Sequence, residues 1–287
     1  MTAKLLSGIE VAEAVIADVR KRVEVLASRG IQPGLGTILV GDDGPSASYV
    51  RKKHEACENA GIRSFHLELP DTINQQEFLN AVEEFNSNDE IDGYIIQYPV
   101  PRGLDFNEAL MMMNPAKDAD GLHPLNLGKL VLQEDGPVPC TPAGIQAILV
   151  HYGIDIAGKE VVIIGRGPTL GRPLSLLLTT KKEGANAAVT VIHSGIRDLS
   201  YFTRRADILI SAAGVASIVK PEMVKPGAVV ISGGISWEGK RLMPDVDESC
   251  AEVAGWITPR LGGVGPTTVA MLLRNTVLAA EARQENL

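Results

Sequence analysis

Two patterns of hydrophobic residues, one typical of helices and one of strands, alternate along this chain. A stripe with steps of three and four predicts an amphipathic helix that starts with a capping box at Ser7 and Glu10 and ends at Gly30. The stripe consists of Ile9, Ala12, Ile16, Val19, Val23 and Leu26. The apolar run at 35–41 is too short for a helix and predicts a buried strand.

The same alternation continues along the rest of the sequence. It predicts helices at 46–60 and 75–86 and strands at 65–69, 94–97, 161–164, 188–193, 208–211 and 229–232. We expect Thr141 and Pro142 to begin a further helix, and Pro266 to open the last one, whose stripe is Val269, Leu272, Leu273, Thr276, Val277 and Ala280. Strands that alternate with helices predict an α/β fold with parallel sheets.

The segment 99–142 interrupts this alternation, because it is rich in Pro, Gly, Asn and Asp. It predicts active-site loops followed by a domain junction. A length of 287 residues also favours two domains over one.

Composition narrows the classes of function. The chain has 45% hydrophobic and 22% charged residues and a net charge of −8, without a basic run, so nucleic acid or an anionic membrane surface is not the expected partner. No apolar stretch has the length of a membrane span, and Cys57, Cys140 and Cys250 are scattered without a CxxC pair. We expect a cytoplasmic protein without a metal site.

A glycine-rich turn follows the strand at 161–164. Gly165, Gly167 and Gly171 form a GxGxxxG pattern, one residue longer than the usual dinucleotide motif, at the start of a helix whose N-terminus suits a pyrophosphate. The alternative is a tight turn before a packing helix. The next strand ends in His193 and Ser194 rather than in an acid, with Arg197 close by and Arg166 in the glycine loop, which favours the 2′-phosphate of NADP over NAD. Arg197 is otherwise a solvated charge at a helix start.

Candidate chemistry lies in the first half of the chain. Tyr49 and Lys53 are four residues apart on one helix face, and a buried lysine beside a tyrosine can move protons. Gln97 stands at the carboxyl end of a buried strand, where open parallel sheets bind ligands, and Pro99 fixes the exit of the chain. In Lys117-Asp118-Ala119-Asp120-Gly121, one carboxylate is expected to face a substrate amine and the other to cap the turn.

Six motifs in this order resemble the bifunctional methylenetetrahydrofolate dehydrogenase/methenyltetrahydrofolate cyclohydrolase family over residues 5–282. They are Tyr49-Val50-x-x-Lys53, Gln97-Tyr98-Pro99-Val100-Pro101, Lys117-Asp118-Ala119-Asp120-Gly121, Pro139-Cys140-Thr141-Pro142, Gly171-Arg172-Pro173 and Gly262-Gly263-Val264-Gly265-Pro266. The departures from the family pattern are Leu261, Ser232-Gly233-Gly234, Gly167 and Ala119.

The resemblance implies a fold of two domains with a cleft between them. A catalytic, folate-binding α/β domain takes residues 1–140, with the C-terminal helix 266–287 packing back onto it, and a doubly wound Rossmann domain takes residues 141–265 and binds NADP. The implied activity is oxidation of 5,10-methylenetetrahydrofolate, then hydrolysis of 5,10-methenyltetrahydrofolate to 10-formyltetrahydrofolate. A homodimer in one-carbon metabolism and purine biosynthesis is also implied.

The resemblance also implies roles for matched positions. Lys53 is the catalytic lysine, Tyr49 stacks on or orients the substrate, Gln97 positions Lys53, and Asp120 binds the amino side of the pterin. Further expected folate contacts are Pro99, Gly262, Gly263, Val264, Gly265, Pro266 and Thr267. Expected cofactor contacts are Gly165, Arg166, Gly167, Gly171, His193, Ser194, Arg197 and Ile235.

Two alternatives from other classes stay open at this point. One is an NADP oxidoreductase that reduces a small ring ketone with a Lys/Asp pair. The other is a dinucleotide-binding regulator without catalysis, which would not need Tyr49, Lys53 and Gln97 to converge. Assays with methylenetetrahydrofolate separate both alternatives from the folate enzyme.

Overall fold

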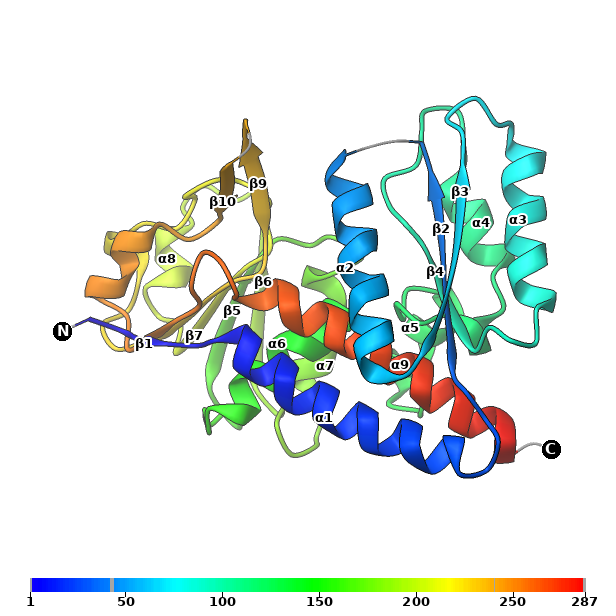
Figure 1. Ribbon diagram of the computed structural model, residues 1–287. Coiled ribbons are helices and arrows are strands. Elements are labelled where there is room, and N and C mark those ends of the chain that lie inside the picture. The colour runs from blue at the N-terminus through cyan, green and yellow to red at the C-terminus, as the bar shows by residue number, and fades with distance from the viewer. Residues whose placement is uncertain (1, 42–43, 240, 286–287) are drawn as a thin grey trace. The chain divides into compact units, whose positions relative to one another are not determined.

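The chain folds into two compact units, each built around its own parallel sheet (Figure 1). The structure is a computed structural model that describes residues 2–41, 44–239 and 241–285, with side chains for all of these except 44–49 and 285. We call Ala14–Val138 with Val269–Leu287 the small-sheet unit, and Met1–Glu13 with Pro139–Thr268 the large-sheet unit.

The small-sheet unit has strand order β3-β2-β4, and all neighbours are parallel. The strands are β2 (Gly34–Val40), β3 (Arg63–Leu69) and β4 (Gly93–Ile96). Its helices include α2 (Gly44–Ala60), α3 (Gln75–Ser87), α4 (Phe106–Met112) and α5 (Pro124–Leu132). Figure 1 shows α2 on one face of this sheet and α3 with α4 on the other. The second face is closed by a core that includes Phe78, Val82, Phe85 and Tyr94.

The two longest helices contribute residues to both units. They are α1 (Gly8–Ala27) and α9 (Val264–Glu285). Within the small-sheet unit, Asn275 on α9 donates to the carbonyl oxygens of Ala119 and Val138, at 2.9 and 3.0 Å. Near the end of α9, Arg283 forms a 3.0 Å ion pair with the buried carboxylate of Asp92. These bonds join the C-terminal helix to the residue before β4, to the loop at 117–121 and to the segment before α6.

The large-sheet unit has strand order β1-β11-β8-β7-β5-β6, again all parallel. The strands are β1 (Lys4–Leu5), β5 (Glu160–Ile164), β6 (Ala188–Ile192), β7 (Ile208–Ser211), β8 (Val229–Ser232) and β11 (Trp256–Ile257). Alternate residues of β5 enter opposite cores: Val161 and Ile163 pack with α6 (Cys140–His151) and α7 (Gly171–Thr179), while Val162 and Ile164 pack on the other face. Short elements on that face are α8 (Ser200–Thr203) and the 3-10 helices η2 (Pro221–Met223) and η3 (Glu248–Glu252).

The order of strands identifies a switch point at β5. The chain leaves β5 for β6 on one side and then crosses to β7 on the other side. In doubly wound sheets, ligands bind outside the carboxyl ends of the strands at this kind of position. The glycine turn at 165–167 follows β5, so it stands at the switch point of this sheet.

The structure corrects several expectations from the sequence. Helix α6 begins at Cys140 after Pro139, so Thr141 is not its N-cap, and α9 begins at Val264, two residues before Pro266. Ser7 Oγ accepts from the backbone N of Glu10 at 3.4 Å, but the Glu10 carboxylate accepts from the Tyr152 hydroxyl instead of closing the capping box.

Two pairings in the large-sheet unit were not expected from the sequence. Strand β1 pairs with β11, which places the first thirteen residues in the large-sheet unit and not with the rest of the expected 1–140 domain. An antiparallel hairpin of β9 (Ile235–Glu238) and β10 (Arg241–Pro244) also forms. Both pairings join short segments with weak hydrophobic periodicity.

Candidate active site

Lys53 and Gln97 meet inside the small-sheet unit. Lys53 on α2 is 6% exposed, and its Nζ donates to Gln97 Oε1 at 3.1 Å. Gln97 follows β4, and its Nε2 donates to the carbonyl oxygen of Tyr98 at 2.8 Å. This second bond fixes the amide so that its oxygen faces the lysine. A buried, oriented amine at the carboxyl end of a parallel strand can bind a polar substrate and move a proton.

The neighbours of Lys53 on α2 have other surroundings. Lys52 is exposed, and His54 turns toward β3, where its Nδ1 hydrogen-bonds the Ser64 hydroxyl and its ring meets His66 edge-on at 5.0 Å. Burial lowers the pKa of His54, and the charges of His66 and Lys53 lower it further. The expected partner Tyr49 lies on α2, but its side chain is outside the described residues.

The two carboxylates of the loop 117–121 differ. Asp118 is 2% exposed and accepts from the backbone N of Gly121 and of His123 and from Asn126 Nδ2, at 2.7–2.9 Å. It is therefore the carboxylate that caps the turn. Asp120 is half-buried, and it remains the candidate for a substrate amine.

Other expected folate contacts are spread over both units. Pro99 is exposed and follows Tyr98 through a cis peptide bond in the small-sheet unit. Residues 262–267 belong to the large-sheet unit, at the start of α9. There the Gly262 carbonyl accepts from the backbone N of Gly8. Thr267 is buried, and its hydroxyl donates to the Val264 carbonyl. Gly262 has φ +75°, which favours glycine.

The glycine turn after β5 has little room for side chains. Gly165 has φ +117°, and a Cβ there would collide with the Ala212 carbonyl; a Cβ on Gly171 would collide with the Gly165 carbonyl. A Cβ on Gly167 would meet no protein atom within 4 Å. The turn thus packs tightly against its own unit and leaves open space at Gly167, in front of the N-terminus of α7. That combination fits a dinucleotide pyrophosphate.

The expected adenosine contacts follow the neighbouring strand. His193 after β6 is half-buried, and its Nδ1 accepts from the backbone N of Gly195 at 3.0 Å. Ser194, Arg197 and, on the glycine turn, Arg166 are exposed. Hydroxyl and guanidinium groups beside the carboxyl ends of β5 and β6 fit a 2′-phosphate. Ile235, expected on the nicotinamide side, is 51% exposed at the start of β9.

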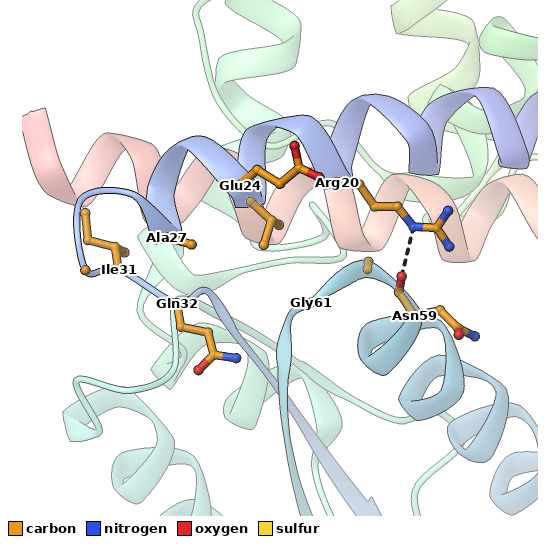
Figure 2. Close-up of a pocket in the computed structure, with 10 residues that line it drawn as sticks. Arg20, Glu24, Ala27, Ile31, Gln32, Asn59 and Gly61 are labelled. Atoms are coloured by element: carbon orange, nitrogen blue, oxygen red, sulfur yellow. Dashed lines mark hydrogen bonds between the residues drawn. The ribbon is translucent and has the colours of Figure 1, made fainter.

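A surface groove in the small-sheet unit contains none of these residues. It is lined by Arg20, Val23, Glu24, Ala27, Gly30, Ile31, Gln32, Asn59, Ala60 and Gly61 (Figure 2). Figure 2 shows Arg20 reaching the carbonyl of Asn59, to which its Nε donates at 2.8 Å. Arg20 thereby caps the last turn of α2.

No helix in 2–41, 44–239 or 241–285 is long and apolar enough to cross a membrane. Within the same ranges, no group of three or more His, Cys, Asp or Glu side chains is placed to hold a metal ion.

Comparison with known proteins assigns both halves of the chain. Residues 6–120 match the tetrahydrofolate dehydrogenase/cyclohydrolase catalytic domain, and residues 139–284 match the NAD(P)-binding domain of the same family. The chain is 70% identical over 283 residues to the bifunctional protein FolD of Syntrophotalea carbinolica, covering 99% of this chain and 98% of that protein.

Solved structures of FolD enzymes match this chain over nearly its full length. The bifunctional FolD enzyme of Campylobacter jejuni is 39% identical, covers 98% of this chain and 99% of its own, and superposes with a TM-score of 0.93. The Trypanosoma brucei enzyme, whose structure is complexed with NADP cofactor and inhibitor, is 36% identical, covers 100% of both chains and gives a TM-score of 0.93. This chain therefore belongs to the tetrahydrofolate dehydrogenase/cyclohydrolase family, and it carries both the catalytic and the NAD(P)-binding domain of that family.

Proposed function

We propose that this enzyme oxidises 5,10-methylenetetrahydrofolate to 5,10-methenyltetrahydrofolate with NADP and then hydrolyses that product to 10-formyltetrahydrofolate. The family match over both domains and the 70% identity to a bifunctional FolD protein support the pair of activities. The observation that carries the hydrolytic step is the buried Lys53 amine held by the oriented amide of Gln97.

Lys53 moves the proton in the hydrolysis. Water attacks the cationic methenyl carbon. As the ring opens, one proton of that water is transferred to the ring nitrogen, and the other is released to solvent together with the positive charge. A lysine amine beside the reacting atoms performs such a transfer when burial keeps part of it neutral. Gln97 fixes the direction of the amine, Tyr49 orients the pterin, and Asp120 accepts from its amino side. Pro99 shapes the wall beside Gln97.

NADP, when bound, supplies the hydride acceptor for the oxidation. The residues that would hold it at the switch point are Gly165, Gly167 and Gly171 around the pyrophosphate, and Arg166, His193, Ser194 and Arg197 around the 2′-phosphate. Ile235 lies on the nicotinamide side. Residues 262–267 approach the folate and nicotinamide through their backbone. The chain's contribution to this step is alignment of donor carbon and acceptor ring.

The two domains take different ligands in this proposal. Residues 1–140, with the C-terminal helix, bind folate, and residues 141–265 bind NADP, apart from the N-terminal segment that forms β1. We further propose a cytoplasmic homodimer whose formyl product serves purine biosynthesis. Exposed apolar side chains on the large-sheet unit, among them Trp237 and Leu261, support the dimer. Light scattering of the pure protein tests it, and a monomer mass at micromolar concentration would refute it.

One coupled assay tests the function. The purified enzyme receives methylenetetrahydrofolate with NADP or with NAD, and NADPH and methenyl absorbance are followed together. We expect NADPH to form faster than NADH, and methenyl absorbance to rise and then decay. Binding of NADP without turnover would indicate a regulator, and turnover only of a ring ketone would indicate the other oxidoreductase.

A further inference from the structure

One buried carboxylate in the large-sheet unit accepts hydrogen bonds from four donors. Asp245, directly after β10, is 0% exposed. Its Oδ2 accepts from Ser211 Oγ at 2.8 Å and from the backbone N of Ala213 and Gly214 at 2.7 and 3.1 Å. Its Oδ1 accepts from the backbone N of Val215 at 2.9 Å. Three consecutive amides of one loop thus point at one side chain.

That loop, residues 212–215, continues β7 at its carboxyl end. Its first residue contacts the glycine turn, because Ala212 N donates to the Ile164 carbonyl at 2.7 Å and the Ala212 carbonyl excludes any side chain at Gly165. The two loops therefore border the switch point between β5 and β7. A dinucleotide whose adenosine lies over β6 extends its other half over β7, so the loop 212–215 underlies the nicotinamide half.

Asp245 also joins the loop after β8. Its backbone N donates to Ser232 Oγ at 3.0 Å and to the Gly234 carbonyl at 3.3 Å. A Cβ on Gly234 would collide with the Asp245 carboxylate, so glycine at 234 lets the carboxylate approach. Ionised oxygens form stronger hydrogen bonds than neutral ones, and a buried acceptor that bonds several donors holds them rigidly.

We propose that Asp245 is a positioning residue for the dehydrogenase step: it sets the backbone of residues 212–215 as the support for the nicotinamide half of NADP. The proposal rests on the NADP placement given under Proposed function. Asp245 follows β10 in the large-sheet unit, whereas the adenosine half is placed over β6, and Lys53 and Gln97 belong to the small-sheet unit. Loss of the Asp245 carboxylate should therefore affect binding of the nicotinamide half in the dehydrogenase step.

Asp245→Asn tests this, because an amide keeps the size but replaces one acceptor oxygen by a donor group. We expect the KM for NADP to rise about tenfold or more, or the dehydrogenase kcat to fall similarly, since a charge-assisted bond is lost and an amide is turned against loop N–H groups. The inhibition constant of 2′,5′-ADP, which carries only the adenosine half, should stay unchanged. Methenyl hydrolysis without dinucleotide should also stay unchanged.

Asp247→Asn is the matched control. Asp247 lies two residues further on, caps η3 and pairs with Lys220 at 2.9 Å on the surface of the same unit. That variant should leave the KM for NADP unchanged. If Asp245→Asn does not fold, Ser211→Ala removes only one bond to the same carboxylate and should raise the KM for NADP severalfold.

The outcomes separate the inference from the placement on which it rests. Unchanged dehydrogenase kinetics in Asp245→Asn overturn the positioning role. Parallel loss of NADP binding, 2′,5′-ADP binding and methenyl hydrolysis shows a purely structural role and overturns it as well. If the unaltered enzyme binds neither NADP nor 2′,5′-ADP, the cofactor placement itself is wrong.

Discussion

Lys53 Nζ and Gln97 Oε1 lie 3.1 Å apart, although the two residues are on different elements and 44 positions apart in the sequence. The lysine comes from the middle of α2 and the glutamine from the residue after β4. Because Gln97 Nε2 is bound to the Tyr98 carbonyl, the amide cannot rotate without losing that bond. The pair is therefore a pre-formed arrangement.

Replacement of Lys53 by Met should abolish hydrolysis of methenyltetrahydrofolate. A methionine keeps most of the side-chain volume but has no proton to give or take, and loss of a general acid–base group costs about 10²-fold or more in rate. Decay of methenyl absorbance measures this. Lys52→Met, at the exposed neighbouring position, should hydrolyse normally, and both variants should bind NADP. Normal hydrolysis by Lys53→Met would exclude the lysine.

Gln97→Glu should move the pH profile of hydrolysis to higher pH. A carboxylate at this position stabilises the ammonium form of Lys53, so the neutral amine appears only at higher pH. The rate at neutral pH should fall and recover in part at alkaline pH. Initial rates over a pH series measure this, corrected for spontaneous hydrolysis. A lower rate with an unchanged profile would mean that Gln97 does not act on the lysine.

Gly167→Ala should weaken NADP binding without loss of stability. The protein has open space at this position, so the thermal midpoint should stay the same, while a methyl group would stand where the pyrophosphate approaches. Gly165→Ala is the contrasting variant, because its Cβ collides with the Ala212 carbonyl and should lower the midpoint. Unaltered NADP affinity in Gly167→Ala would support a plain turn.

Arg166→Gln should reduce the preference for NADP over NAD. In the proposed cofactor placement the Arg166 guanidinium pairs with the 2′-phosphate, and a hydrogen bond to a charged group contributes about 1.5–3 kcal/mol, which corresponds to roughly tenfold or more in affinity. The KM for NADP should rise while that for NAD stays constant. The same measurement on Arg197→Gln decides whether Arg197 binds phosphate or is a solvated charge; equal changes for both dinucleotides would contradict a 2′-phosphate role.

Asp207→Asn should flatten the acid dependence of stability. The Lys225 ammonium, at 2.7 Å, and the backbone N of Glu160 lower the pKa of Asp207. A lowered pKa stabilises the fold above the unfolded value of about 3.9, and this contribution is lost as the pH falls through the lower folded value.

The variant should therefore unfold at a slightly lower temperature than the unaltered protein at neutral pH, by a small amount because the pair is partly exposed. This gap in unfolding temperature between the variant and the unaltered protein should close in acid. Scanning calorimetry over a series of pH values measures it. Glu252→Gln, an exposed carboxylate of the same unit, is the control. A gap that stays constant with pH would contradict the ion-pair argument.

Local sequence patterns were enough to predict the elements with strong hydrophobic periodicity. The stripe on α9 is buried at every expected position, from Val269 to Ala280, and the apolar run of β2 is fully buried. The glycine turn at 165–171 was recognisable because the conformation of Gly165 and the close backbone contacts of Gly165 and Gly171 exclude side chains, a requirement that falls on residue type itself.

The sequence by itself thus determined an α/β chain of two domains with a dinucleotide turn, because periodicity and glycine spacing are local properties, and its six ordered motifs carried the resemblance to the family. The tertiary structure decided which acid caps the 117–121 turn, that Lys4 and Leu5 join the large sheet, and that Asp245 organises two loops. None of these has a local signal, since a lone carboxylate or a two-residue strand takes its role from partners that are distant in sequence. Only the folded chain brings those partners within hydrogen-bonding distance.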